Sequence, residues 1–307
     1  RPSAERASLL CKADLPTAMV KEFPGLQGIM GREYARLSGE APEVCQAIEE
    51  HYLPRFAGDR LPASAAGAAV ALADRLDSIV GCFGIGLIPT GSEDPYALRR
   101  AALGVVQILL QRAWCLPLDE AVDCAQAGFG GAGGPKAEAT RRTVLEFLRG
   151  RTQAVLVERG LPGNIVEAVL SAGANDIADV ARRAEALGAL RLEADFAELA
   201  TAFRRVVGII PHGFDRPADA ARFVEGAERA LYAQAVELKG EVDRLVAARD
   251  YLGALRRIAA LRPVVDMFFE EVLVIGPDEG LTQNRFALLR TVGNLLARIA
   301  DFTKITG

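Results

Sequence analysis

The chain has 307 residues, of which 50% are apolar and 25% are charged, a composition typical of a globular protein long enough for two domains. It has no run of about 18 apolar residues, so we expect no membrane-spanning helix. The formal net charge of −4 argues against indiscriminate binding of phosphate, so a nucleic-acid surface would have to be a local patch.

In the first half of the chain, apolar residues recur at spacings of three and four, which predicts helices. The expected helices cover residues 5–22, 41–52, 63–83, 95–114 and 118–127. Asp94 suits an N-cap with Pro95 at the first helical position. Because the chain starts at Arg1 without Met and enters a helical pattern at once, we interpret it as a fragment that lacks its N-terminal portion. No basic stretch followed by an apolar one is present, so nothing in the sequence argues for secretion.

The stretch Gly128 to Pro135 is the strongest candidate for a linker. It is glycine-rich but lacks the GK[ST] ending of a phosphate-binding loop and follows a helix rather than a strand. Further helices are expected at 136–159, 162–171, 176–187 and 193–207. Three more apolar segments follow, and a final helix begins near Gln283 and runs to Ile305. Helices joined by short connections predict an all-α fold ending in a bundle.

The sequence is poor in groups that bind metals or act as nucleophiles. The five cysteines are widely spaced without a CxxC motif, which favours free, buried thiols of a cytosolic protein over a zinc site; they are Cys11, Cys45, Cys82, Cys115 and Cys124. The two histidines, His51 and His212, have no partner histidine at metal-binding spacing. We therefore expect neither a catalytic residue nor a metal site in this chain.

Three polar positions in the first hundred residues follow a recognisable order: Lys12, Asp14 and Asp74. This order resembles the helical HD-type metal phosphohydrolases, which use a His-Asp pair on one helix and a later helical Asp. Here Lys12-Ala13-Asp14 stands in place of the His-Asp pair. A lysine ammonium repels a cation and neutralises a carboxylate instead. We therefore expect Lys12, Asp14 and Asp74 to form a structural network in a degenerate HD-like domain.

Paired arginines are the remaining signal for a functional surface. Residues 196–307 hold 15 basic and 15 acidic residues, whereas residues 1–195 hold 21 basic and 25 acidic ones, so a basic patch is more plausible in the C-terminal third. Arg204-Arg205 is distinguished from the other pairs by its apolar frame, Phe203 before it and Val206-Val207 after it. A guanidinium held in such a frame suits phosphate groups or base edges.

Ordered motifs along the chain resemble the β subunit of the bacterial two-subunit glycyl-tRNA synthetase. The motifs are Lys12-Ala13-Asp14-Leu15, Gln27-Gly28-Ile29-Met30-Gly31, Tyr52-Leu53-Pro54-Arg55-Phe56-Ala57-Gly58-Asp59, Ala73-Asp74-Arg75-Leu76-Asp77 and Asp94-Pro95-Tyr96-Ala97-Leu98-Arg99-Arg100. The match is weak over residues 120–195.

The last hundred residues resemble the helical anticodon-binding bundle shared by that subunit and arginyl-tRNA synthetase. Phe203-Arg204-Arg205-Val206 and Asn284-Arg285-Phe286-Ala287-Leu288-Leu289 carry this likeness. The resemblance implies that Arg204, Arg205, Asn284 and Arg285 contact tRNA. The family often has Asn after the basic pair, and this chain has Gly208 there.

The resemblance implies three regions: an HD-like domain at 1–127, connecting helices at 136–192 and an anticodon-binding bundle at 193–307. It implies a cytoplasmic, tRNA-binding, non-activating portion of a glycine–tRNA ligase. The α subunit of the heterotetramer would carry the ATP- and Mg-dependent activation of glycine. This portion would bind tRNA-Gly and no DNA, hold no cofactor of its own and be catalytically inactive alone. The alternatives are a helical scaffold and an HD-type phosphohydrolase-like domain, both without an RNA role.

Overall fold

The computed structural model describes residues 1–90, 94–130 and 134–305, and its elements are helices throughout, which confirms the predicted all-α fold. The chain divides into two compact units. Unit 1 comprises residues 1–155 and 175–178, and unit 2 comprises residues 156–174 and 179–307. The expected connecting region, 136–192, is thus shared between the units. Within the described ranges, no helix is both long and apolar enough to cross a membrane.

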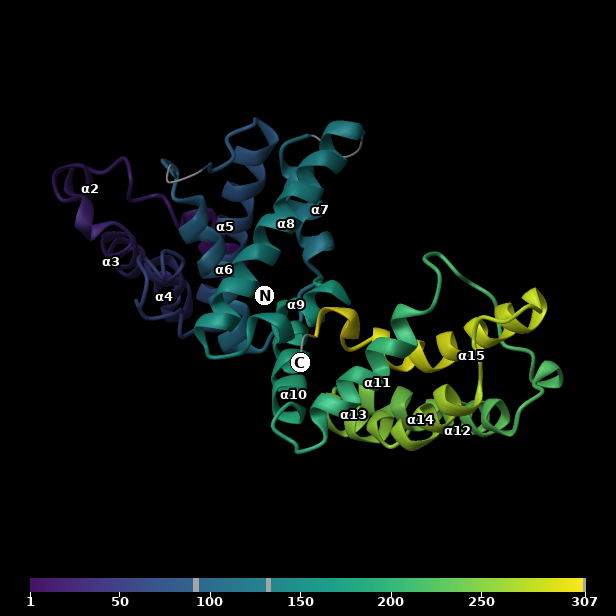
Figure 1. The fold of residues 1–307 in the computed structure, drawn as a ribbon. Coiled ribbons are helices and arrows are strands. Elements are labelled where there is room, and N and C mark those ends of the chain that lie inside the picture. The colour runs from purple at the N-terminus through teal and green to yellow at the C-terminus, as the bar shows by residue number, and fades with distance from the viewer. Residues whose placement is uncertain (91–93, 131–133, 306–307) are drawn as a thin grey trace. The chain divides into compact units, whose positions relative to one another are not determined.

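Unit 1 begins with short helices and continues with longer ones that form its core (Figure 1). In chain order they are α1 (Pro2–Leu10), α2 (Ala18–Glu22), α3 (Ile29–Leu37), α4 (Pro42–Glu50), α5 (Ala65–Gly84), α6 (Leu98–Arg112), α7 (Leu118–Gly128) and α8 (Pro135–Glu158), whose last residues belong to unit 2.

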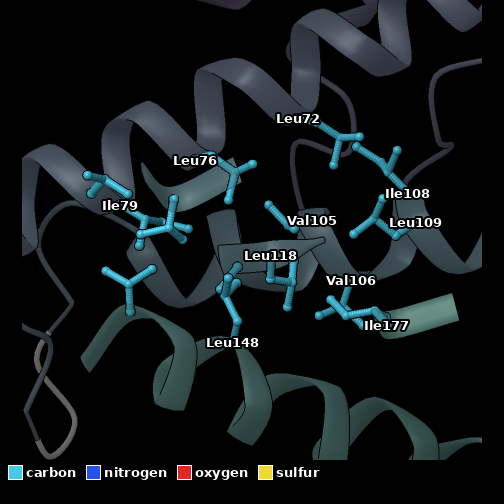
Figure 2. Close-up of a cluster of buried hydrophobic side chains, with 14 of the residues drawn as sticks. Leu72, Leu76, Ile79, Val105, Val106, Ile108, Leu109, Leu118, Leu148 and Ile177 are labelled. Atoms are coloured by element: carbon cyan, nitrogen blue, oxygen red, sulfur yellow. The ribbon is translucent and has the colours of Figure 1, made fainter. Parts of the chain in front are cut away.

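The largest core of unit 1 lies where α5, α6, α7 and α8 meet (Figure 2). Its branched side chains are excluded from water; among them are Leu76, Ile108, Leu118 and Leu148. Ile177 joins the same core from the segment 175–178, and the Asn175 carbonyl accepts a 2.8 Å hydrogen bond from the Leu118 amide. This apolar burial fixes α5, which carries Asp74 and Arg75.

Two predictions for the first forty residues are wrong. The single helix expected over 5–22 is broken between Leu10 and Ala18, a stretch that contains Pro16, and proline in a helix interior removes a backbone donor. Helix α3 lies between the helices expected at 5–22 and 41–52, where none was predicted. Gly28 has a φ of 80° and is the N-cap of α3, so the glycine starts a helix there.

The start of α6 is displaced from its predicted position. Asp94-Pro95 was expected to open the helix, but α6 begins at Leu98 after Ala97 adopts a left-handed conformation with φ of 55°. The Asp94 carboxylate nevertheless accepts hydrogen bonds from the amides of Leu98 at 2.7 Å and Arg99 at 3.0 Å. Asp94 therefore satisfies the first free amides of the helix from the turn before it.

Unit 2 contains two helices joined by a turn region, followed by a bundle. Its helices are α9 (Gly163–Ser171), α10 (Ile177–Leu190), whose residues 177–178 belong to unit 1, α11 (Phe196–Gly208), α12 (Gly226–Ala247), α13 (Tyr251–Ala259), α14 (Arg262–Glu271) and α15 (Glu279–Ala297). Arg183 links the early and late parts of this unit through hydrogen bonds to the carbonyls of Gly173, at 2.6 Å, and Ile299, at 3.3 Å. The final helix stops at Ala297, so the prediction that it runs to Ile305 is wrong.

Two further expectations concern loops and thiols. The linker expected at Gly128 to Pro135 falls between α7 and α8, and its residues 131–133 lie outside the described residues. All five cysteines are free, but only Cys11 and Cys45 are buried; Cys82 is partly buried and Cys115 and Cys124 are exposed, so the prediction of buried thiols is wrong for the last two. Cys115 lies in the connection that precedes α7 and Cys124 lies on that helix.

Candidate functional site

Lys12 and Asp74 form an ion pair in unit 1. Burial lowers the pKa of Lys12, but the hydrogen bond and the negative charge of Asp74 outweigh it, so the pKa rises above its ordinary value. Both side chains are partly exposed, at 49% and 26%. Ion pairs of that exposure contribute about 0–1 kcal/mol to stability. The Asp74 carboxylate is therefore engaged by a cation of the chain itself.

Asp14 lies in a different contact. Its side chain is buried, and its Oδ2 accepts hydrogen bonds from the amides of Gly28 at 2.7 Å and Gly31 at 3.1 Å. These are free amides at the start of α3, where a negative charge is favourable. The three predicted positions thus separate into the Lys12–Asp74 pair and the Asp14 cap. This geometry is compatible with the structural role predicted for Lys12, Asp14 and Asp74, and that role stays a prediction.

His51 is fully buried beside this pair. Its Nδ1 lies 2.6 Å from the carbonyl oxygen of Ile48, which assigns the ring proton to Nδ1, and its Nε2 has no hydrogen-bond partner among the described residues. Burial lowers the pKa of His51 below 6.5, while Asp74 opposes and Lys12 and Arg75 reinforce that shift. His51 is therefore a neutral histidine in the folded chain near neutral pH.

We expect the stability of the wild-type chain to fall more steeply with acidification, below about pH 6.5, than that of a His51→Asn variant. The unfolded chain takes up a proton at His51 near pH 6.5, and the folded chain does not, because its pKa is lowered. The resulting loss cannot exceed about 1.4 kcal/mol per pH unit. Urea unfolding at a series of pH values measures it, and equal pH slopes in the two proteins would contradict it.

Arg75 anchors the same region through backbone contacts. It is buried on α5, and its guanidinium donates to the carbonyl oxygens of His51 at 2.9 Å, Tyr52 at 3.1 Å and Pro54 at 3.1 Å, besides Ala71 on its own helix. Burial lowers the pKa of Arg75, and the charge of Asp74 opposes this. Arg75 stands within a motif quoted above, but nothing in the sequence indicated that it holds the 51–54 segment.

Arg285 is buried in unit 2 and forms an ion pair there. Its Nε donates to the Glu228 carboxylate at 2.7 Å, and its Nη1 donates to the Leu273 carbonyl at 2.8 Å. Glu228 is 1% exposed and also accepts hydrogen bonds from the amides of Val224 and Glu225, at 2.6 and 2.8 Å. Arg285 therefore connects α15, α12 and the segment after α14. Sequence reasoning missed Glu228, because its partner lies 57 residues away.

Asn284 is buried next to Arg285 and holds the connection that precedes α12. Its side-chain oxygen accepts a hydrogen bond from the Asp219 amide at 2.8 Å, and its side-chain nitrogen donates to the Asp219 carbonyl at 3.0 Å. Both polar groups of this amide are therefore engaged with the chain itself. The geometry gives Asn284 and Arg285 internal partners, so it does not support their predicted contact with tRNA.

Arg205 and Arg204 face different surroundings on α11. The Arg205 side chain is exposed, and its guanidinium carbon lies 4.0 Å from the centre of the Phe269 ring on α14. Such a cation–π contact stabilises the pair and orients the guanidinium plane. Arg204 is half-buried, and its Nε has no hydrogen-bond partner in the described part of the chain. Phe269 was not predicted as a site residue.

The four residues predicted to bind tRNA therefore do not share one environment. Arg285 is directed to Glu228 on α12, whereas Arg205 is directed to Phe269 on α14. Of the predicted residues, Arg205 is exposed and Arg204 is half-buried, so these two remain available for contact with a ligand. Across residues 1–90, 94–130 and 134–305, no group of three or more His, Cys, Asp or Glu side chains has the arrangement of a metal site.

The chain is similar to known proteins that share one description. The family model described as the glycyl-tRNA synthetase beta subunit matches residues 2–171. The glycine–tRNA ligase beta subunit of Geobacter sp. (strain M21) is 48% identical over 303 residues, which are 98% of this chain and 44% of that protein. The corresponding subunit of Moorella thermoacetica is 45% identical over 311 residues, 99% of this chain and 44% of that protein.

The matches place this helical chain in a family of aminoacyl-tRNA synthetase subunits. The chain belongs to the glycyl-tRNA synthetase β-subunit family, as the sequence motifs indicated. It spans less than half the length of the curated relatives that it matches.

Proposed function

We propose that the chain is a tRNA-binding, non-activating portion of a glycine–tRNA ligase that supports ATP-dependent attachment of glycine to tRNA-Gly. The observation that carries the proposal is the pairing of similarity to the family over nearly the whole chain with an exposed arginine, Arg205, whose guanidinium carbon lies 4.0 Å from the centre of an aromatic ring. Unstacked bases of RNA loops stack on guanidinium planes and accept hydrogen bonds from their edges.

The proposal assigns activation of glycine, with ATP and Mg, to a partner α subunit in a cytoplasmic heterotetramer. The relatives are named as beta subunits, which supports the existence of a partner subunit. The proposed contribution of this chain is to bind tRNA-Gly and not DNA. Alone, it would then form no glycyl-adenylate.

We expect Arg205→Ala to weaken binding of tRNA-Gly by about 1–3 kcal/mol, the usual loss when a stacked base loses its platform. Arg205→Lys should not restore the affinity, because an ammonium has no planar face. Titrations of the chain with tRNA-Gly and with a non-cognate tRNA, each at two salt concentrations, measure the effect. In both variants, the ratio of the affinity for tRNA-Gly to the affinity for the non-cognate tRNA should be smaller than in the wild type.

Arg257→Ala is the matched control for this titration. Arg257 is also an exposed arginine of unit 2, but it is paired with Glu241 at 2.7 Å. Its removal should leave tRNA binding unchanged. If the Arg205 variants bind both RNAs as the wild type does, with unchanged circular dichroism, the proposed contact is wrong.

A helical scaffold without RNA binding is the second candidate. The internal contacts of Asn284 and Arg285 favour it, because these two residues serve the packing of unit 2. Wild-type chain that binds tRNA-Gly and the non-cognate tRNA equally weakly at both salt concentrations would support the scaffold.

A further inference from the structure

Unit 1 contains a solvent-accessible cavity that the proposed contact on α11 does not use. Its volume is about 590 Å³, within the range of about 300–1,000 Å³ that holds small ligands. The turn at 24–27, the segment 51–55, α5 and the residues around the start of α6 line it. All of these belong to unit 1.

Positive charge predominates in the lining of this cavity. Arg55, Arg75 and Arg100 line it, and none of them forms an ion pair with a carboxylate within the described residues. Asp74 is the acidic residue of the described lining, and it is already paired with Lys12. A cavity with this balance attracts anions, although the whole chain has a net charge of −4.

The arginines at the mouth keep donors available. Arg55 uses one Nη2 hydrogen bond to the Gln27 carbonyl at 3.1 Å, and Arg100 uses one Nη1 hydrogen bond to the Arg55 carbonyl at 3.3 Å. Each guanidinium has five N–H donors, so several remain to bind an oxyanion. The bond from Arg100 to the backbone of Arg55 also ties together the two segments that carry them.

An aromatic side chain lies beside these donors. Tyr96 lines the cavity and is 57% exposed. The next residue, Ala97, has the left-handed φ of 55° that an alanine rarely adopts. Tyr96 thus lies in the turn that leads into α6. Arginines next to an exposed aromatic ring are the combination that binds single-stranded nucleic acid, with phosphates on the charges and bases on the ring.

We propose that this cavity binds one nucleotide of single-stranded RNA, with a phosphate on Arg55 and Arg100 and the base stacked on Tyr96. The inference rests on the proposed function, since it adds a second RNA contact, on unit 1, to the contact proposed for Arg205. A free nucleoside monophosphate presents the same chemistry, so the experiment includes one.

The test measures fluorescence anisotropy of a labelled single-stranded hexaribonucleotide, with tRNA-Gly and adenosine monophosphate as parallel ligands of the same chain. Tyr96→Ala should weaken hexaribonucleotide binding by about 5- to 100-fold, as expected for one stacked base. Arg100→Gln should reduce the slope of log affinity against log salt by about 0.7, the value for one phosphate of a single strand. The control is Arg36→Gln, whose arginine is 63% exposed, is paired with Glu33 and lies outside the cavity lining; it should change neither quantity.

The outcomes separate this inference from the proposed function. If the wild type binds tRNA-Gly and the hexaribonucleotide, and both cavity variants bind them equally well with unchanged melting temperature, the cavity is not an RNA site although the proposed function stands. If adenosine monophosphate binds and the hexaribonucleotide does not, the assignment to RNA is overturned. If the wild type binds no RNA at all, the proposed function fails together with this inference.

Discussion

Glu228→Ala is expected to destabilise the chain by about 3–5 kcal/mol, because it removes one partner of a buried ion pair and leaves the other charge uncompensated. Glu228 is 1% exposed, and its carboxylate receives hydrogen bonds from Arg285 and from the amides of Val224 and Glu225. Its loss therefore leaves the charge of Arg285 without a carboxylate, and it leaves the amides of Val224 and Glu225, just before α12, without an acceptor. Urea unfolding followed by circular dichroism measures the change.

Glu241→Ala is the control on the same helix. Glu241 pairs with Arg257, but their side chains are 39% and 51% exposed, so its removal should cost no more than about 1 kcal/mol. If Glu228→Ala and Glu241→Ala lower the free energy of unfolding equally, the buried pair does not stabilise unit 2 more than the exposed pair does.

Lowering the pH should reproduce part of the loss of stability expected for Glu228→Ala. Burial raises the pKa of Glu228, but the hydrogen bonds and charge of Arg285 outweigh it and lower the pKa below 4.5. The stabilisation is thus present above about pH 4.5 and is lost as the pH falls through the folded-state pKa.

Arg75→Met is expected to destabilise unit 1 by about 3 kcal/mol or more, since it leaves several buried carbonyl groups without donors at about 1–3 kcal/mol each. Those carbonyls belong to the segment 51–54. Methionine approximates the volume of the arginine stem, so a loss on this scale comes from the hydrogen bonds. Thermal and urea unfolding provide the measurement.

Asp77→Ala provides the comparison for Arg75. Asp77 lies on the same helix and is exposed, so its replacement should change the stability by less than about 0.5 kcal/mol. If Arg75→Met is tolerated as well as Asp77→Ala, the arginine is not the anchor of the segment that precedes α5.

The helices could be predicted where apolar periodicity is long and uninterrupted, as in α5, α8 and α12. Prediction failed where one side chain far away in sequence decides the local structure. The start of α3 depends on Asp14, which lies 14 residues before Gly28, and the start of α6 depends on the left-handed Ala97. Periodicity carries no information about either.

The candidate site could be predicted less well than the fold, because a motif does not show where a side chain points. The block containing Asn284 and Arg285 was recognised, but the structure directs both side chains to Asp219, Leu273 and Glu228. Arg205 was found through its apolar neighbours, whereas its partner Phe269 lies 64 residues later in an apolar segment that reads as core.

The exchange of short segments between the two units bears on how the protein can be divided. Residues 156–174 belong to unit 2 although residues 175–178, which follow them, belong to unit 1. A cut near residue 193 would place the partners of two hydrogen bonds on different fragments. The Ala168 carbonyl would lose its 2.8 Å hydrogen bond from the Asp301 amide, and Arg183 would lose its hydrogen bond to the Ile299 carbonyl. A single cut in the chain therefore cannot separate the two units with all their residues. A recombinant fragment that contains the C-terminal bundle has to retain the residues from 156 onward.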